Sequence, residues 1–172
     1  MSEDGREPFV GKITQKAILF GPDGDVLVTG SDETPEPPGG TFEFGETLVD
    51  GLRRELQEEL GIDARVGPPV ETLYGGWADD SGTPMVALVY RCETDEREVT
   101  LNEEHEFARW VAPEEAAQRF GAVIGRLEQA VRRAEKIENS GPFTAVADPY
   151  ADSDTTSEEV VAALEAARTD DG

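Results

Sequence analysis

The chain has 172 residues and a mass of 18.6 kDa, which is enough for one ordinary domain with its own hydrophobic core. Its 38 acidic residues against 15 lysines and arginines give a formal net charge of -23, which argues against duplex nucleic acid as a partner, because duplex binding depends on cationic contacts to phosphates. The single cysteine, Cys92, excludes an internal disulfide and is expected to be a buried, inert thiol in a strand.

Two strands are predicted near the start of the chain, after a polar segment of residues 1–8. Residues 11–20 and 26–30 are rich in apolar side chains, and the GPDG sequence between them is a strong turn signal. A second turn is predicted at residues 37–40, PPGG, where the glycines leave the backbone open to close approach. Backbone carbonyls or amides of this turn can therefore be offered to a metal or a phosphate.

The next predicted element is a helix over residues 48–60. Thr47 can cap its start, leucines recur every four residues in an apolar stripe, and Gly61 stands where a left-handed residue commonly ends a helix. Gly51 faces the same side of the helix as Glu55, Glu58 and Glu59, although a mid-helix glycine costs about 1 kcal/mol relative to alanine. This glycine either leaves room for a metal or a substrate, or it allows close packing of the helix.

Three glutamates of this helix form a candidate metal site. Glu55, Glu58 and Glu59 are spaced i, i+3 and i+4, so we expect their carboxylates to lie close together at the rim between core and solvent. Like charges at this spacing repel one another, and a cation among them would relieve the repulsion. Hard oxygen ligands suit Mg²⁺ or Mn²⁺, and Mg²⁺ binds through few carboxylates together with substrate phosphates. The pattern predicts a metal-dependent diphosphate site.

Further strands and then two helices are predicted for the rest of the domain. Pro113 opens a short helix, and apolar spacing over residues 123–134 marks a longer one. This order of elements fits a mixed α+β domain better than a doubly wound one. The strands are expected around residues 64–74, 85–92 and 107–111.

Residues 40–62, GTFEFGETLVDGLRRELQEELGI, resemble the Nudix box. The box has the pattern G-x5-E-x7-R-E-U-x-E-E-x-G-U, where U is apolar, and every defined position is matched here. The resemblance implies a Nudix-type α/β/α sandwich with a mixed sheet, in which the box forms a loop, a helix and a loop. It also implies hydrolysis of a nucleoside diphosphate linked to another moiety, a reaction on phosphoric anhydride bonds of a small nucleotide-type substrate.

The resemblance also implies roles for the box residues. The three helix glutamates match the family's ligands for Mg²⁺ or Mn²⁺, and the carbonyl of Gly40 is a further candidate ligand. Glu46 and Arg54 are expected to hold the loop and the helix of the box in place. The metal would neutralise the diphosphate while a carboxylate accepts a proton from the attacking water.

Two sets of residues are candidates for this proton acceptor. Glu58 or Glu59 is the first choice. The family often takes a ligand or base from an acidic loop outside the box, and LNEEHEFARWV, residues 101–111, offers such a loop. We take Glu104 as the candidate from this loop, where Glu103 and Glu106 are alternatives.

Other residues with functional side chains have simpler interpretations. His105 is the single histidine, and a polar loop residue is a commoner outcome than a proton-transfer group. Trp110 is expected in the core. Tyr74 and Trp77 follow a predicted strand beside two glycines, where a stack on a nucleobase is conceivable.

Two other functions are compatible with such a domain. A catalytically silent nucleotide-binding or regulatory module would be expected to lack some of the box acids, and none is missing. Isomerisation of a prenyl diphosphate is disfavoured because no cysteine lies near the box. The substrate is left open by the segments outside the box, and noncanonical nucleoside triphosphates are the default expectation.

The predicted domain covers residues 9–138 and is followed by an acidic tail, residues 139–172. The tail is rich in Ser, Gly, Asp, Thr and Pro, which is typical of a linker or a disordered segment. Residues 157–168 can still form an amphipathic helix. This helix would dock on the domain, contact a second subunit in a homodimer, or stay mobile.

The acidic excess extends over both the domain and the tail. It is typical of proteins from extreme halophiles, where salt near 1 M shortens the Debye length to about 3 Å and makes dense negative charge tolerable. We therefore expect a halophilic source. The first residues are polar and no apolar run approaches a membrane span of about 20 residues. We expect a cytoplasmic protein without membrane contact.

Overall fold

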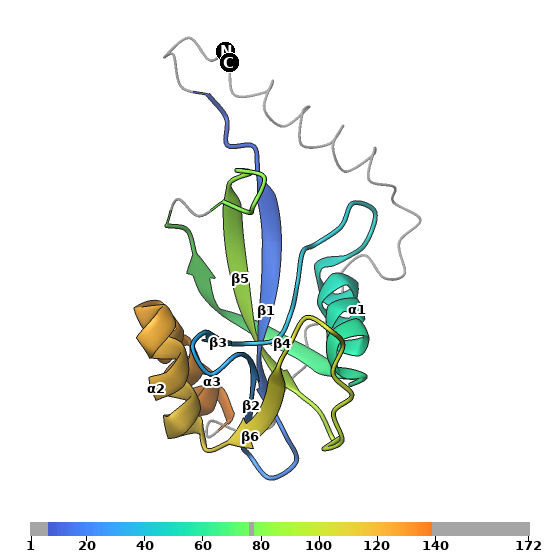
Figure 1. Cartoon of the computed structure of the whole chain (residues 1–172), viewed down its shortest axis with the longest axis vertical. Coiled ribbons are helices and arrows are strands. Elements are labelled where there is room, and N and C mark those ends of the chain that lie inside the picture. Colours follow the sequence, from blue (N-terminus) through green and yellow to red (C-terminus); the bar gives the residue numbers. More distant parts are fainter. Residues whose placement is uncertain (1–6, 76–77, 139–172) are drawn as a thin grey trace.

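The computed structural model describes residues 7–75 and 78–138 (Figure 1). Trp77 and the helix expected in the tail lie outside these residues. No helix in the described part is long and apolar enough to span a membrane. Apart from the short strand β3, which was not predicted, the elements follow the predicted order: β1 Lys12–Phe20, β2 Val26–Gly30, β3 Pro35–Glu36, α1 Leu48–Leu60, β4 Arg65–Leu73, β5 Met85–Glu93, β6 Phe107–Val111, α2 Pro113–Val123 and α3 Gly125–Glu138.

The described strands form one mixed sheet. Its order is β3-β2-β1-β5-β4, and β6 also pairs with β2, off this path. β1 and β5 run parallel, in a register that begins at Lys12 and Met85 and ends at Phe20 and Glu93. The other strand pairs are antiparallel. The mixed sheet predicted from the sequence is therefore confirmed.

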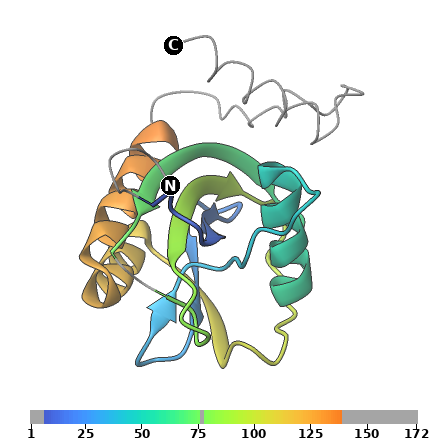
Figure 2. The ribbon, with the colours of Figure 1, turned by 90° about the horizontal axis from the view of Figure 1, so that it is seen from above.

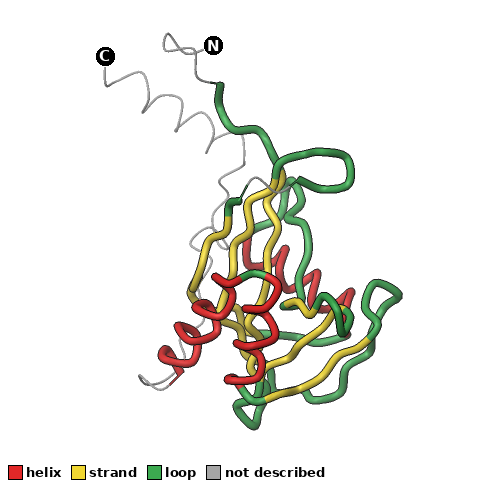
Figure 3. The backbone as a smooth tube through the Cα atoms, turned by 60° about the vertical axis from the view of Figure 1, so that its left-hand side comes forward, coloured by secondary structure: helices red, strands yellow, loops and turns green. Residues whose placement is uncertain are grey.

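Helices cover both faces of this sheet. Seen from above, α1 stands on one side of the strands and α3 on the other (Figure 2), and the backbone trace shows the strands between the outer helices (Figure 3). Alternation along β1 supplies both layers, because Ile18 packs toward α2 and α3 whereas Leu19 packs toward α1. The chain thus has the α/β/α sandwich that the resemblance implied.

The ends of α1 are fixed by the residues that predicted them. The Thr47 side chain accepts a hydrogen bond from the Asp50 amide at 3.1 Å, which satisfies one of the free donors of the first turn. Gly61 ends the helix with a φ of 66°, the left-handed conformation that favours glycine. These two caps set the length of α1 and with it the position of the glutamates on its surface.

Buried polar groups hold the sheet against α3. The Glu71 carboxylate on β4 pairs with Arg126 at 2.8 Å and with Arg133 at 2.7 Å, both on α3. The guanidinium of Arg91, on β5, lies over the Phe20 ring, 4.7 Å from its centroid.

Neighbouring Cys92 is fully buried, and burial raises the pKa of its thiol to about 12. The prediction of a buried cysteine in a strand is confirmed.

Candidate active site

The PPGG segment, residues 37–40, runs alongside β1 like an extra strand. The Ala17 amide donates to the Pro38 carbonyl and the Gln15 amide to the Gly40 carbonyl, each at 2.8 Å. Gly39 lies between these two bonds with a φ of 135°, and a Cβ there would lie 2.0 Å from the Gln15 carbonyl oxygen. The PPGG sequence therefore allows the backbone to approach β1 more closely than any side chain would permit.

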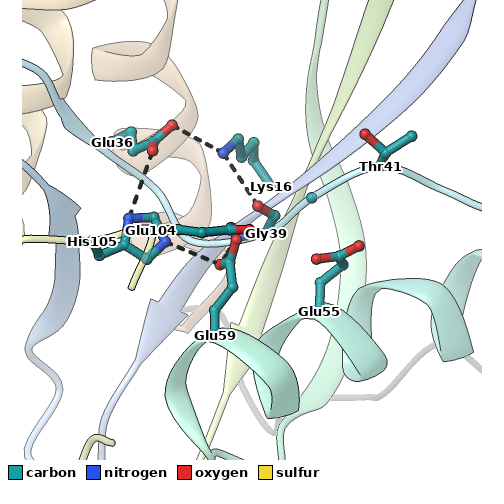
Figure 4. Close-up of a pocket in the computed structure, with 9 residues that line it drawn as sticks. Lys16, Glu36, Gly39, Thr41, Glu55, Glu59, Glu104 and His105 are labelled. Carbon is teal, nitrogen blue, oxygen red and sulfur yellow. Dashed lines mark hydrogen bonds and ion pairs between the residues drawn. The ribbon is translucent and has the colours of Figure 1, made fainter. Parts of the chain in front are cut away.

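A cavity of about 310 Å³ opens where this turn, α1 and the loop before β6 meet (Figure 4). Four of the residues predicted for the site line it, namely Gly40, Glu55, Glu59 and Glu104. The structure adds Lys16 from β1 and Glu36 from β3, which sequence reasoning missed. The signal for Lys16 was a charged residue in the middle of an apolar strand. The full lining is Lys16, Glu36, Gly39, Gly40, Thr41, Glu55, Glu59, Glu104 and His105.

Glu59 is the most enclosed carboxylate of the cavity. Its side chain is only 5% exposed, and its Oε2 accepts a hydrogen bond from the Gly39 amide at 3.0 Å. His105 Nε2 lies 3.3 Å from the same oxygen. Burial raises the pKa of Glu59, although the Gly39 amide, the Lys16 ammonium and His105 work in the opposite direction. Glu59 thus lies against the Gly39 amide and His105.

Two of the three glutamates predicted for the site line the cavity, and the third does not. Glu55 and Glu59, one turn apart, line the cavity, whereas the Glu58 carboxylate lies 59% exposed, 3.2 Å from Arg54. Within the described residues no three acidic, histidine or cysteine side chains are close enough to form a metal centre. Arg54 Nη1 donates to Glu55 at 2.8 Å and to Glu58 at 3.2 Å, so this one nitrogen lies between those two carboxylates. That all three glutamates bind a metal stays a prediction.

Arg54 and Glu46 make the contacts expected of supporting residues. All five N–H donors of Arg54 are used: Nε and Nη2 donate to Glu46, Nη2 also donates to the Thr41 carbonyl, and Nη1 donates to Glu55 and Glu58. The hydrogen bond from Arg54 lowers the pKa of Glu46. One guanidinium therefore ties the box loop to α1.

The carbonyl of Gly40, a predicted metal ligand, is already engaged in hydrogen bonds. It accepts hydrogen bonds from the Gln15 amide at 2.8 Å and from the Thr14 hydroxyl at 3.2 Å, so β1 already uses it. The Gly39 carbonyl instead lies 3.3 Å from the Lys16 ammonium in the cavity. A Cβ at Gly40 would overlap the Glu55 carboxylate, at 2.2 Å. Gly40 thus makes room for Glu55, and Gly39 replaces it as the carbonyl candidate.

Gly51 is needed for packing and not as space for a metal. A Cβ there would lie 2.7 Å from Glu46 Oε1 and 3.0 Å from Gln15 Oε1. Neither side chain can easily move away, because Arg54 holds Glu46 and the side-chain amide of Gln15 donates to the Leu48 carbonyl at 2.7 Å. Of the two explanations left open for this glycine, the packing one is correct.

We therefore expect Gly51→Ala to destabilise the protein by about 1 to 3 kcal/mol through overpacking, even though alanine favours helices. Urea unfolding at neutral pH measures this change. Gly125→Ala on α3 is the matched control, because a Cβ at Gly125 meets nothing within 4 Å. A Gly51→Ala variant as stable as the control would contradict the packing explanation.

The loop before β6 brings Glu104 and His105 to the cavity. The Asn102 amide donates to the Glu59 carbonyl at 3.1 Å, and the Asn102 side chain accepts from the Glu104 amide at 3.0 Å. Of the three acids proposed here, Glu104 is the one that lines the cavity. His105 is a loop residue, as expected, but it is buried: its side chain is 4% exposed and lies between Glu59 and Glu36.

Known proteins similar to this chain share both its sequence pattern and its fold. The NUDIX domain family matches residues 12–133. A MutT-like protein of Streptomyces ambofaciens is 27% identical over 142 residues, which are 81% of this chain and 86% of that protein. The nucleoside triphosphatase NudI of Escherichia fergusonii is 36% identical over 90 residues, a match that spans 46% of this chain and 62% of NudI.

Solved structures agree with this assignment at the level of the fold. The MutT protein from Methanosarcina mazei Go1 superposes with a TM-score of 0.61 at 21% identity, over 79% of this chain and all of that one. A binary complex of the C. elegans Ap4A hydrolase gives a TM-score of 0.65 at 18% identity, over 76% of this chain and 99% of that one. The chain belongs to the Nudix family, the class of hydrolases that act on phosphoric anhydride bonds, as the box predicted.

Proposed function

We propose that this protein is a divalent-metal-dependent pyrophosphohydrolase that cleaves a nucleoside diphosphate linked to another moiety by water attack on phosphorus. The observation that carries the proposal is the cavity where Glu55 and Glu59 of the box face Glu104 from a separate loop. A catalytically silent binding module would not need acids supplied from two elements around one cavity. Full retention of the box acids supports turnover for the same reason.

The residues around the cavity fit a hard divalent ion. Glu55, Glu59 and the Gly39 carbonyl supply oxygen donors, and Mg²⁺ commonly binds through one or two carboxylates while it keeps several waters. Glu58 belongs to the proposed ligand set on the strength of the box alone, since its carboxylate is turned toward Arg54. When bound, Mg²⁺ or Mn²⁺ would neutralise and orient the diphosphate.

The protein's own residues would position this chemistry. Oε2 of Glu59 accepts the hydrogen bond from the Gly39 amide and lies 3.3 Å from His105 Nε2, so Oε1 is the oxygen that we propose for the ion or for a water molecule. Glu59 is our first candidate to accept the proton of the attacking water, and Glu104 is the second. Arg54 would keep Glu55 at the cavity wall through its 2.8 Å contact.

Nucleoside triphosphates, noncanonical ones included, are the proposed substrate class. The similarity to a nucleoside triphosphatase supports this choice over other anhydrides. A panel of nucleotides should give a nucleotide plus phosphate or pyrophosphate when Mg²⁺ or Mn²⁺ is present. EDTA should stop the reaction.

The panel is best assayed by ion-exchange chromatography of the products, in low salt and in molar KCl, because the chain is so acidic. Absence of product from every nucleotide under both conditions would contradict the proposal. Tight nucleotide binding in calorimetry without any product would favour the silent module instead.

A further inference from the structure

One lysine lies among the acids of the cavity. Lys16 is the single lysine or arginine among the lining residues that the structure describes, beside four glutamates and one histidine. Its side chain is 20% exposed, and its ammonium donates to Glu36 Oε2 at 3.0 Å and to the Gly39 carbonyl at 3.3 Å. An ammonium has three donors, so one of them is left for a further acceptor.

Arg54, the arginine beside the cavity, cannot bind an incoming phosphate. Arg54 uses all five of its N–H donors on the box loop and on α1. A substrate that approaches four carboxylates needs positive charge besides a divalent ion, because its own oxygens are anionic. Within the described lining, Lys16 is the residue that can provide this charge.

We propose that Lys16 is a substrate-binding residue that contacts a phosphate group of the substrate, and that Glu36 holds its side chain in the free enzyme. This inference deepens the proposed hydrolysis and depends on it. The long, flexible stem of lysine lets the ammonium turn from Glu36 to a phosphate oxygen. Glu36 can release it readily, since its own side chain is 43% exposed and the pair is only partly buried.

The position of Lys16 has a second consequence, for the metal. Its ammonium lies against the Gly39 carbonyl, the same oxygen that is the candidate ligand. A divalent ion at that oxygen would be repelled by the ammonium until Lys16 turns away. Removal of the lysine should therefore weaken the binding of substrate and strengthen the binding of metal, whereas damage to the fold would weaken both.

Lys16→Met tests the inference, because methionine keeps most of the stem and removes the charge. We expect KM for the best nucleoside triphosphate of the panel to rise about tenfold or more, as for loss of a charge-assisted hydrogen bond, with kcat changed by less than about threefold. The Kd for Mn²⁺ alone, measured by electron paramagnetic resonance of the free ion, should fall about threefold or more. Lys16→Arg should restore part of the KM.

Lys12→Met is the matched control. Lys12 lies on the same strand but pairs with Asp79, away from the cavity lining. KM and Mn²⁺ affinity of this variant should match those of the wild type. If Lys16→Met has a KM within twofold of Lys12→Met, or binds Mn²⁺ more weakly than the wild type, the inference about Lys16 is wrong. If the wild type itself hydrolyses no nucleotide, the proposed function fails first.

Glu36→Gln gives an independent test in which the lysine stays in place. It should release Lys16 and lower KM in the wild-type background but not in the Lys16→Met background. An equal effect in both backgrounds would show that Glu36 acts by its own charge and would overturn its assigned role. This variant also keeps the inference testable if Lys16→Met does not fold, because an equal KM for Glu36→Gln and the wild type would then count against it.

Discussion

Glu59→Gln is expected to lower kcat for nucleotide hydrolysis by at least about 100-fold, the scale for loss of a group that accepts a proton in the reaction. Glutamine has the same shape, and its carbonyl oxygen can still accept the hydrogen bond from the Gly39 amide that now reaches Glu59 at 3.0 Å. The variant therefore removes a charge from the cavity without removing the contact that positions the side chain. A loss of activity would then report on chemistry and not on the fold.

Stability should move in the opposite direction from activity. Burial raises the pKa of Glu59 above the ordinary value of 4.5, so the folded state prefers the protonated carboxyl. Ionisation of Glu59 then lowers wild-type stability as the pH rises from 4.5 through the raised pKa, and the loss persists at higher pH. Glu59→Gln lacks this loss. Without metal at pH 7 it should be as stable as the wild type or more stable, a trade between stability and function.

Single-turnover kinetics and urea unfolding in EDTA measure the two effects. Glu115→Gln is a suitable control, since Glu115 forms an exposed pair with Arg119 on α2, outside the cavity lining. A kcat for Glu59→Gln within tenfold of the control would refute the role assigned to Glu59. A strong loss of stability would instead make Glu59 a structural residue.

Local features of the sequence predicted α1 well. Its cap, its leucine stripe and its terminal glycine act within one or two turns, so Thr47 and Gly61 fix the helix whatever the rest of the chain does. The pairing of β1 with β5 could not be predicted in the same way. It joins residues 12–20 to residues 85–93, and nothing local specifies such a register.

The same distinction separates the predicted from the unpredicted parts of the site. Glu55 and Glu59 were found because one helix places them a turn apart. Lys16 and Glu36 reach the cavity from two different strands, so they become neighbours only when the sheet forms. The burial of His105 was not predicted for a related reason: its loop is polar in sequence, but the packing of that loop against the end of α1 buries the ring.

Arg54→Gln is expected to destabilise the protein by about 2 to 4 kcal/mol at pH 7. The substitution leaves Glu46 and Glu55 without their cation, and their side chains are only 17% and 14% exposed. Partly buried carboxylates without a partner are costly. Activity should fall as well, because the guanidinium holds Glu55 at the cavity wall. Arg54→Lys should rescue little, since an ammonium cannot replace five donors in a planar fork.

The pH dependence of this effect follows from Glu46. Arg54 holds the pKa of Glu46 below its ordinary value of 4.5, so the stabilisation from this pair is present above pH 4.5 and is lost as the pH falls through the lowered pKa. The difference in unfolding free energy between wild type and Arg54→Gln should thus be largest at neutral pH and shrink in acid. Arg53→Gln is the control. The Arg53 guanidinium pairs with Asp63 in an exposed contact, so its loss should change the free energy of unfolding by less than about 0.5 kcal/mol. Urea unfolding of both variants at pH 7 and at several values below pH 4.5 decides the matter. Equal destabilisation of the two at pH 7, or a gap that does not narrow across the acid series, would mean that Arg54 does not organise the box.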